Sequence, residues 1–323
     1  MTAGVLYALA AGLMWGLVFI VPTLLPGYPP ALQSAGRYLA FGLIALPLAW
    51  LDRTALRQLT RADWLEALKL ALAGNLLYYV CLATAIQRTG GPLPTMIIGT
   101  LPIVIAITAN LRNAQRDGHL PWLRLAPSLA MVATGIACVN QAELGTLRGS
   151  SSDDLWRYAS GIPFAVAGVA CWTWYPLRNA DWLRDHPGRS PRTWATAQGV
   201  ATLPLALGAY VLVWLWEGTR GDAGFAMPFG PQPLYFVGLM AASGLFASWL
   251  GTVCWNEASQ RLPTALVGQL IVFETLAALV YAFALRREWP PLLTLAGIVL
   301  LVAGVVWALR VEPEPLAAEA HAN

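Results

Sequence analysis

The chain has 323 residues, of which 57% are hydrophobic and only 11% are charged, and its formal net charge is +3. Water-soluble domains carry about 25% charged residues, so this composition excludes a soluble protein and indicates an all-α polytopic membrane protein. The 15 tryptophans are also typical of a chain in a bilayer, where indole rings gather at the interfaces.

A helix needs about 20 mostly apolar residues to cross the hydrocarbon core of a membrane. Ten stretches meet this requirement, and we expect each to form a transmembrane helix: 3–24, 31–51, 64–87, 92–112, 121–140, 159–180, 192–216, 233–257, 263–285 and 289–310. The tail at 311–323 is polar and contains proline, and we expect it to be disordered.

Basic residues predict the direction in which the chain crosses the membrane. If the N-terminus lies inside, the inner loops and the tail contain more arginines than the outer loops, as the positive-inside rule requires. No basic residue precedes the first span, so it does not resemble a secretory signal and is expected to be retained. We therefore expect a multi-pass protein of a bacterial-type inner membrane, with both termini in the cytoplasm.

Short matches recur in the same order in the two halves of the chain. The matching segments are 8–15 with 165–172, 46–49 with 203–206, 94–99 with 263–268, and 121–135 with 290–304. Their order and shared offsets indicate an internal repeat. The sequence therefore predicts a first five-helix repeat at 1–140, an outer connecting loop at 141–158 and a second five-helix repeat at 159–310.

Each predicted repeat contains five helices, an odd number, so the second copy must enter the membrane from the opposite side. Inverted repeats of this kind occur in many secondary transporters, where the substrate site lies near the bilayer midplane between the halves. Rocking one half against the other exposes that site to each side in turn. The repeat therefore favours a secondary transporter that works by alternating access.

The joints between certain spans resemble a known family. The third and fourth spans are joined as LATAIQRTGGPLPTMIIGTLPIVIAI, and the eighth and ninth as WNEASQRLPTALVGQLIVFETLAAL. Over residues 3–310 the chain resembles the drug/metabolite transporter superfamily, EamA type, whose members show a Pro or Glu-Pro at mid-helix after such joints. Pro102 and Glu274 match these positions, whereas Thr275 stands where the usual Pro would follow. The resemblance implies the fold and the export of small metabolites, without identifying the substrate.

Two ionisable residues lie inside apolar spans, Arg37 in the second and Glu274 near the centre of the ninth. Such residues are costly in a membrane unless they face a cavity or a partner. The repeat aligns Arg37 with Trp194. It aligns Glu274 with Ile105, so neither charge is duplicated and the symmetric scaffold does not require them. We interpret both as facing a central pathway, with Arg37 near its outer half; the alternative is that each bonds backbone groups or a neighbouring helix.

A guanidinium, a carboxylate and several rings would together suit a zwitterion with an apolar side chain, such as an amino acid. Arg37 would bind its carboxylate, Glu274 its ammonium group and the rings its side chain. The predicted substrate site adds further aromatic and amide side chains from within the spans: Trp15, Asn75, Tyr78, Tyr79, Trp172, Tyr175, Gln198, Trp249 and Gln269. For any one ring, simple packing or a place at the membrane interface is the alternative.

Glu274 is also the candidate for proton coupling. It lies about eleven residues, or roughly 16 Å, from either end of its span, so its side chain cannot reach an interface. Burial favours the neutral acid, whereas Arg37 or a bound ammonium group favours the carboxylate. A carboxyl group balanced in this way would exchange a proton for a cationic substrate group.

Other functions are weighed against this interpretation. Efflux of lipophilic organic cations, with Glu274 as the anionic site, is the alternative within transport. An intramembrane enzyme or a receptor is a different class, but the chain has no HExxH or GxSxG motif and no Asp in any predicted span. A receptor would not need inverted halves, and the chain has no GxxxxGK[ST] motif for ATP.

The expected partners are a small-molecule substrate and the lipid bilayer, without nucleic acid, and the expected state is a monomer or a homodimer. We expect no cofactor and no metal. Four cysteines lie within the predicted spans without disulfide or metal-ligand spacing, and we interpret them as small hydrophobic residues: Cys81, Cys138, Cys171 and Cys254.

Overall fold

The computed structural model describes residues 2–89, 92–112, 121–144, 152–220, 225–287, 289–308 and 310–311. Within these ranges every element of regular secondary structure is a helix. Residues 145–151 of the predicted outer loop and 312–323 of the predicted tail lie outside the described residues. The described ends of that loop are helical, because the flanking helices extend to Leu144 and back to Ser152.

The helices follow one another along the chain with short connections. Those before residue 150 are α1 (Thr2–Gly16), η1 (Leu17–Phe19), α2 (Val21–Leu24), α3 (Pro30–Leu51), α4 (Arg53–Leu56), α5 (Arg61–Leu70), η2 (Ala71–Leu77), α6 (Tyr78–Thr89), α7 (Pro92–Ile98), α8 (Leu101–Arg112) and α10 (Trp122–Leu144). Those after it are α11 (Ser152–Asp185), α12 (Pro191–Arg220), α13 (Pro233–Ala242), η4 (Ser243–Leu250), α14 (Gly251–Arg261), α15 (Thr264–Leu270), α16 (Val272–Arg286) and α17 (Leu292–Ala308).

Six segments of the described chain are long and apolar enough to cross a membrane: Thr2–Leu24, Pro30–Leu51, Arg61–Thr89, Pro191–Thr219, Pro233–Arg261 and Leu266–Leu285. They correspond to the first, second, third, seventh, eighth and ninth predicted spans. Large apolar side chains such as Leu123, Leu212 and Leu292 are exposed on the surface, as suits contact with lipid. The polytopic all-α membrane class is therefore confirmed, whereas the count of ten spans stays a prediction.

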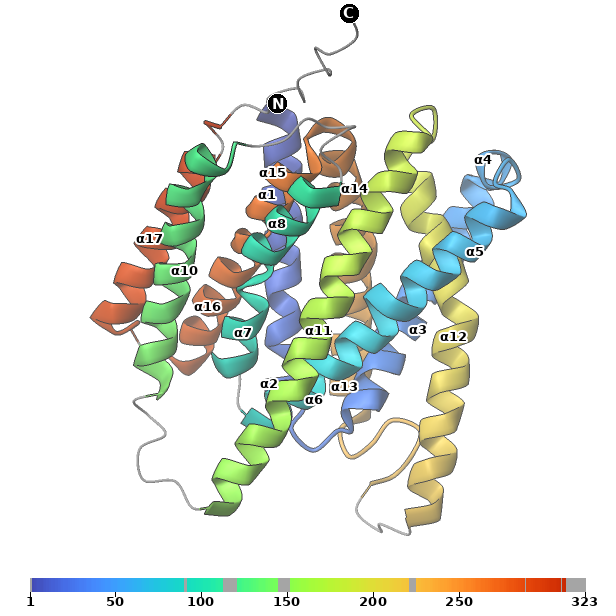
Figure 1. Ribbon diagram of the computed structural model, residues 1–323. Helices are drawn as coiled ribbons and strands as arrows, with labels where there is room; N and C mark the ends of the chain where they lie inside the picture. The colour runs from blue at the N-terminus through green and yellow to red at the C-terminus, as the bar shows by residue number, and fades with distance from the viewer. Residues whose placement is uncertain are drawn as a thin grey trace, which may run out of the picture.

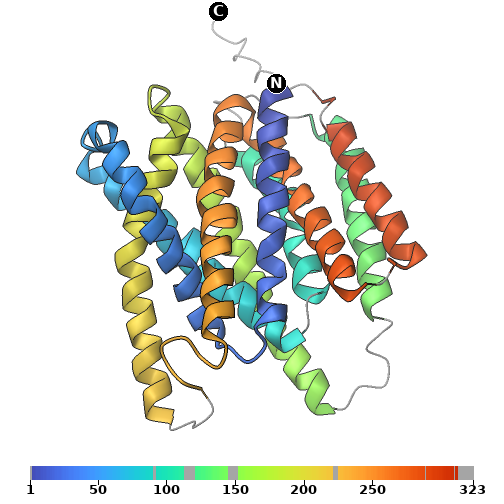
Figure 2. The ribbon, with the colours of Figure 1, turned by 180° about the vertical axis from the view of Figure 1, so that it is seen from behind.

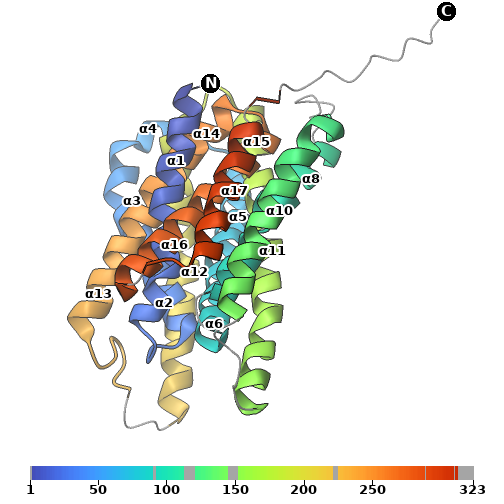
Figure 3. The ribbon, with the colours of Figure 1, turned by 90° about the vertical axis from the view of Figure 1, so that its left-hand side faces the viewer.

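The long helices form one bundle in which elements distant in sequence lie side by side. At one edge α3 packs along α12, and at the other edge α10 packs along α17 (Figures 1 and 2). Between these pairs, α1 packs on α14 and α16, and α11 packs on α6. The N-terminus and α4 lie at one end of the bundle, which we call the N-terminal face, and the start of α13 lies at the opposite face (Figure 3).

The fourth and ninth predicted spans are not continuous helices, contrary to the sequence expectation, and in the first span η1 and Ile20 separate α1 from α2. The fourth is interrupted at Gly99–Thr100, between α7 and α8, because Pro102 has no N–H with which to bond the Ile98 carbonyl. The ninth is interrupted at Ile271, between α15 and α16, although no proline lies there. After this break the Glu274 N–H bonds the Ile271 carbonyl at 2.9 Å, which is the tighter i→i−3 turn.

The third and eighth predicted spans each pass through a π-helix, η2 and η4. Such segments, with i→i+5 bonding, are rare and are frequently found at functional sites. Both lie against α3, whose Ser34 hydroxyl donates to the Leu76 carbonyl of η2 at 3.0 Å. The two irregular segments therefore share one neighbouring helix.

Glycine allows the closest helix contacts in the bundle. A Cβ on Gly16 would lie 2.6 Å from the Ala277 Cβ, and a Cβ on Gly12 would lie 3.0 Å from the Glu274 backbone nitrogen. Small residues at such positions let two backbones approach, so α1 lies directly against α16.

The α3–α12 contact provides a test of this packing. A Cβ on Gly199 of α12 would lie 2.6 Å from the Ala45 Cβ and 3.0 Å from the Phe41 ring, so Gly199→Val should destabilise the protein by about 1–3 kcal/mol through overpacking. Gly208 of the same helix faces open space and gives a matched control, Gly208→Val. Thermal unfolding of the purified variants should show a lower midpoint for the first alone. Equal midpoints would mean that the described α3–α12 contact is wrong.

Candidate functional site

The two ionisable residues of the apolar helices meet at one small cavity, which we call the central cavity. Its volume is about 10 Å³, room for about one water molecule. It is lined by residues of nine elements: Trp15, Val18, Arg37, Tyr38, Asn75, Tyr78, Trp172, Ala247, Ser248, Thr252 and Glu274. Six residues predicted for the substrate site are therefore brought together.

Arg37 is held by the π-helix η4. Its Nε donates to the Ser248 hydroxyl at 3.0 Å, and its Nη2 donates to the Ala247 carbonyl at 3.1 Å. The rings of Tyr38 and Tyr79 lie 5.0 Å and 4.7 Å from the guanidinium carbon, within cation–π range. The side chain is only 3% exposed, so these contacts replace the water that the charge loses on burial.

Glu274 lies in the first turn of α16 and is only 2% exposed. Within the described residues, its Oε2 atom and the Nη1 atom of Arg37 have no hydrogen-bond partner. A buried charge is costly alone, and an opposite charge in the same cavity offsets part of that cost. The Tyr78 hydroxyl and the Trp172 Nε1 atom, which belong to the same lining, also have no hydrogen-bond partner among the described residues.

Stacked aromatic rings form one wall of the central cavity. The Trp172 ring stacks on Tyr78 with centroids 4.8 Å apart and on Tyr175 at 4.9 Å, and Trp15 meets Trp172 edge-on at 5.0 Å. The stack depends on Gly74 of η2, where a Cβ would lie 2.1 Å from the Tyr175 ring. This wall offers a rigid surface for an apolar side chain or for a cation.

Buried amides connect this wall to the N-terminal face. Tyr175 donates to the Gln198 Oε1 atom at 2.9 Å. Gln198 Nε2 and Trp194 Nε1 each donate to the Asn179 Oδ1 atom at 2.9 Å, and Asn179 Nδ2 donates to the Asn256 Oδ1 atom at 2.8 Å. These bonds, which we call the amide network, hold α11, α12 and α14 together between the cavity and the N-terminal face.

Ion pairs hold further helices together at that face. Arg178 of α11 binds Glu66 of α5 through two bonds of 2.5 and 3.2 Å. Arg112 of α8 lies 2.8 Å from Asp181 of α11. Partly exposed pairs contribute little stability one by one, but together they bridge α11 to two other helices. The amide network and these ion pairs therefore connect the helices that lie between the central cavity and the N-terminal face.

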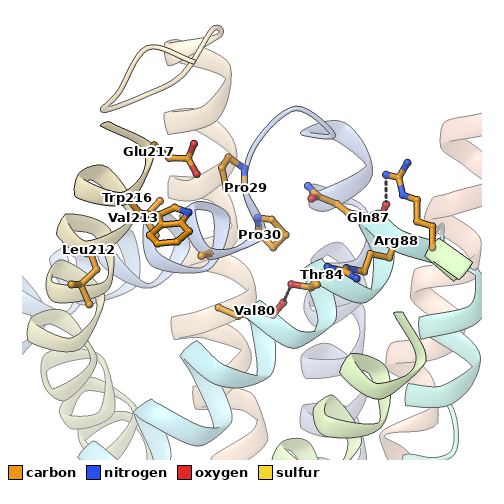
Figure 4. A pocket seen from close by; sticks show the side chains of 12 residues that line it. Pro29, Pro30, Val80, Thr84, Gln87, Arg88, Leu212, Val213, Trp216 and Glu217 are labelled. Atoms are coloured by element: carbon orange, nitrogen blue, oxygen red, sulfur yellow. Dashed lines mark hydrogen bonds between the residues drawn. The ribbon is translucent and has the colours of Figure 1, made fainter. Parts of the chain in front are cut away.

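The opposite face is more open. A cavity of about 860 Å³, here called the opposite-face cavity, lies between the start of α3, the end of α6, the start of α11 and the end of α12 (Figure 4). Its volume falls within the range of small-molecule sites. Two of the helices that line it, α3 and α6, also line the central cavity.

Five predicted site residues do not line the central cavity. Tyr79 lies behind Arg37. Tyr175 is the ring of the aromatic stack farther from the cavity, and Gln198 bonds its hydroxyl, so these residues support the cavity residues without lining the cavity. The side chains of Trp249 and Gln269 are directed toward other helices, where each has a hydrogen-bond partner. The Trp249 Nε1 donates to Thr196 at 3.3 Å, and the Gln269 Oε1 accepts from Ser128 at 2.8 Å.

Five lining residues were missed by the sequence interpretation: Val18, Tyr38, Ala247, Ser248 and Thr252. Ser248 and Thr252 are four residues apart in the eighth predicted span, so they share one helix face, and that spacing was the available signal. Small hydroxyl residues also bond the backbone of their own helix, which makes this signal weak.

Thiols and carboxylates give no sign of a metal site in the residues described. No three His, Cys, Asp or Glu side chains of that part of the chain lie close enough to hold a metal ion. The four cysteines are free, with Cys81 buried and the others half-buried.

Comparison with known proteins gives similarities of three kinds: to a family, to a protein of known sequence and to a solved structure. A model of the EamA-like transporter family matches residues 2–117. Inner membrane protein YtfF of Escherichia coli (strain K12) is 58% identical over 314 residues, which is 97% of each chain. A protein of known crystal structure is similar over 94% of this chain and 96% of its own, with a TM-score of 0.68 and 16% identity, which shows a shared fold.

The amide network predicts a large effect of one substitution. Asn179→Ala would leave Trp194, Gln198 and Asn256 with unpaired buried groups, each costing about 1–3 kcal/mol. Asn75→Ala is the control, since Asn75 makes one long bond, of 3.3 Å to Thr202. The thermal unfolding midpoint of Asn179→Ala should fall well below that of the control. Equal unfolding midpoints for the two variants would mean that the amide network does not hold the helices as described.

Proposed function

The chain belongs to the EamA-like transporter family, and from this premise we propose that it exports small zwitterionic metabolites, amino acids or related compounds, by alternating access. This family membership confirms the resemblance to EamA-type transporters that the sequence predicted. As a multi-pass inner membrane protein it acts on a substrate that crosses the bilayer, and both termini lie in the cytoplasm under this proposal, as the arginine distribution predicts.

The substrate class rests on one observation: Arg37 and Glu274 line the same cavity, each with one unpaired polar atom. A guanidinium N–H is suited to a carboxylate and a carboxylate oxygen to an ammonium group, so the pair matches the two ends of an amino acid. The stacked rings beside them would contact an apolar or aromatic side chain.

The volume of the central cavity supports alternating access. At about 10 Å³ it has no room for an amino acid, so helices around it must separate for a substrate to enter. The amide network and the ion pairs would separate when the site opens to the N-terminal face. The opposite-face cavity already separates α6 from α12 at the other end, so these two gates would open in turn.

Paired features of the bundle support two inverted five-helix halves, at 1–140 and 159–310. The second and seventh predicted spans pack together as α3 and α12, and the fifth and tenth as α10 and α17. The first packs on the eighth and the sixth on the third, which are equivalent contacts under the repeat. The π-helices lie in the third and eighth spans, and the breaks lie in the fourth and ninth.

A second candidate function is export of lipophilic organic cations by proton exchange. It is favoured by the rings beside the Glu274 carboxylate, which suit a cation, and by the two protein bonds that already hold the Nε and Nη2 atoms of Arg37. The two candidates differ in the need for Arg37, because only a substrate with a carboxylate requires it.

Substitutions at the two charges test the proposal. Glu274→Gln keeps the shape and removes the charge, so the purified variant should fold while its transport efficiency for amino acids falls about tenfold or more. It should also lose any dependence of transport on a proton gradient. The measurement is uptake of a labelled amino acid panel and of organic cations into proteoliposomes at several pH values.

Arg37→Gln provides the comparison in the same assay. Loss of amino acid transport in both variants supports the zwitterion, whereas loss in Glu274→Gln alone, with cations as the transported compounds, supports the second candidate. An unchanged rate and pH dependence in Glu274→Gln would make that residue structural and would reject both.

A further inference from the structure

The opposite-face cavity has two chemically different walls (Figure 4). One wall is basic and comes from the last turn of α6 and the second turn of α11, with Arg88 and Arg157. The other is apolar and comes from the last turns of α12, with Leu212, Val213 and Trp216. The prolines at the start of α3, Pro29 before it and Pro30 as its first residue, lie between the two walls.

Neighbouring residues hold the two arginines at the cavity, and among the described residues further N–H groups of both guanidinium groups have no partner. Arg88 Nη1 donates to the Ser160 hydroxyl at 2.9 Å, and its guanidinium lies 5.3 Å from the Phe164 ring. Arg157 Nη2 donates to the Gln87 carbonyl at 3.0 Å. Each guanidinium has five N–H donors, so the one bond that each makes to a described residue leaves most of the donor capacity for a ligand. Among the described residues of the lining, Glu217 is the acidic one, so two positive charges lie there with one negative charge.

The apolar wall is continuous with the outer surface of the bundle. Leu212 is 68% exposed and Trp216 61% exposed, and the adjacent Leu215 of α12 is 64% exposed. In a membrane-spanning chain such a surface contacts lipid. Trp216 lies four residues from the end of α12, at the depth where tryptophan meets the headgroup layer. The cavity therefore joins the hydrocarbon surface at one side and presents cations at headgroup depth.

We propose that the opposite-face cavity is a binding site for an anionic phospholipid, whose acidic headgroup is held by Arg88 and Arg157 and whose apolar part lies against Leu212, Val213 and Trp216. Guanidinium groups bind phosphate oxygens through charge-assisted hydrogen bonds, and a phospholipid headgroup provides such oxygens. A soluble anion would use the arginines but would leave the exposed apolar wall without a role. This inference does not depend on the identity of the transported substrate.

The test compares lipids on the intact protein. Protein in detergent is mixed with phosphatidylglycerol or with phosphatidylcholine of the same acyl chains, and native mass spectrometry measures the fraction that retains lipid. Wild-type protein should prefer phosphatidylglycerol, and the double variant Arg88→Gln with Arg157→Gln should lose about tenfold or more of this preference. Arg287→Gln is the matched control, because Arg287 is exposed after α16, at the same face and outside the cavity lining, and it should keep the preference.

Two results would overturn the proposal. One is that the wild-type protein shows no preference for phosphatidylglycerol, or that the double variant keeps this preference. The other is a double variant with unchanged lipid retention but a raised KM for transport, since the cavity would then recognise the transported solute. Circular dichroism and the unfolding midpoint of each variant establish that it is folded before lipid is added.

Discussion

The buried guanidinium of Arg37 is the interaction on which the arrangement of the centre depends. A charge inside a membrane protein needs polar partners, and here they come from η4, through the Ala247 carbonyl and the Ser248 hydroxyl. One turn earlier on α3, Ser34 bonds the Leu76 carbonyl of η2. The same helix is thus tied to both π-helices, so a shift of either segment changes the position of the positive charge.

The surroundings of this charge determine what the site can bind. Glu274 supplies the opposite charge from α16, and the stacked rings of Tyr78, Trp172 and Tyr175 supply a flat apolar wall from α6 and α11. Because these groups come from separate helices, a relative movement of the helices separates or assembles the site. The closed cavity, the bonded N-terminal face and the larger cavity at the other end are consistent with such movement.

Composition and helical length were enough to predict the membrane class, since lipid imposes long apolar helices. Arg37 and Glu274 were predicted as cavity residues because ionisable groups in apolar helices have few other places to lie. Neutral polar residues such as Gln269 were harder to assign to the cavity, because an amide side chain can equally bond a neighbouring helix. A single sequence does not reveal which face of a helix meets which neighbouring helix. The two π-helices and the break at Ile271 contain no proline, so no local sequence pattern predicted these irregular segments.

The most direct test of the central claim is the accessibility of one lining position from each side of the membrane. Thr252 lines the central cavity, and Thr252→Cys would be made in a chain whose four native cysteines are replaced by alanine. The measurement is the rate of modification by a membrane-impermeant thiol reagent added to either side of oriented vesicles, with and without a transported amino acid. An alternating-access site predicts modification from both sides and a slower rate when substrate is bound. Modification from one side alone, or rates that no transported substrate changes, would contradict it.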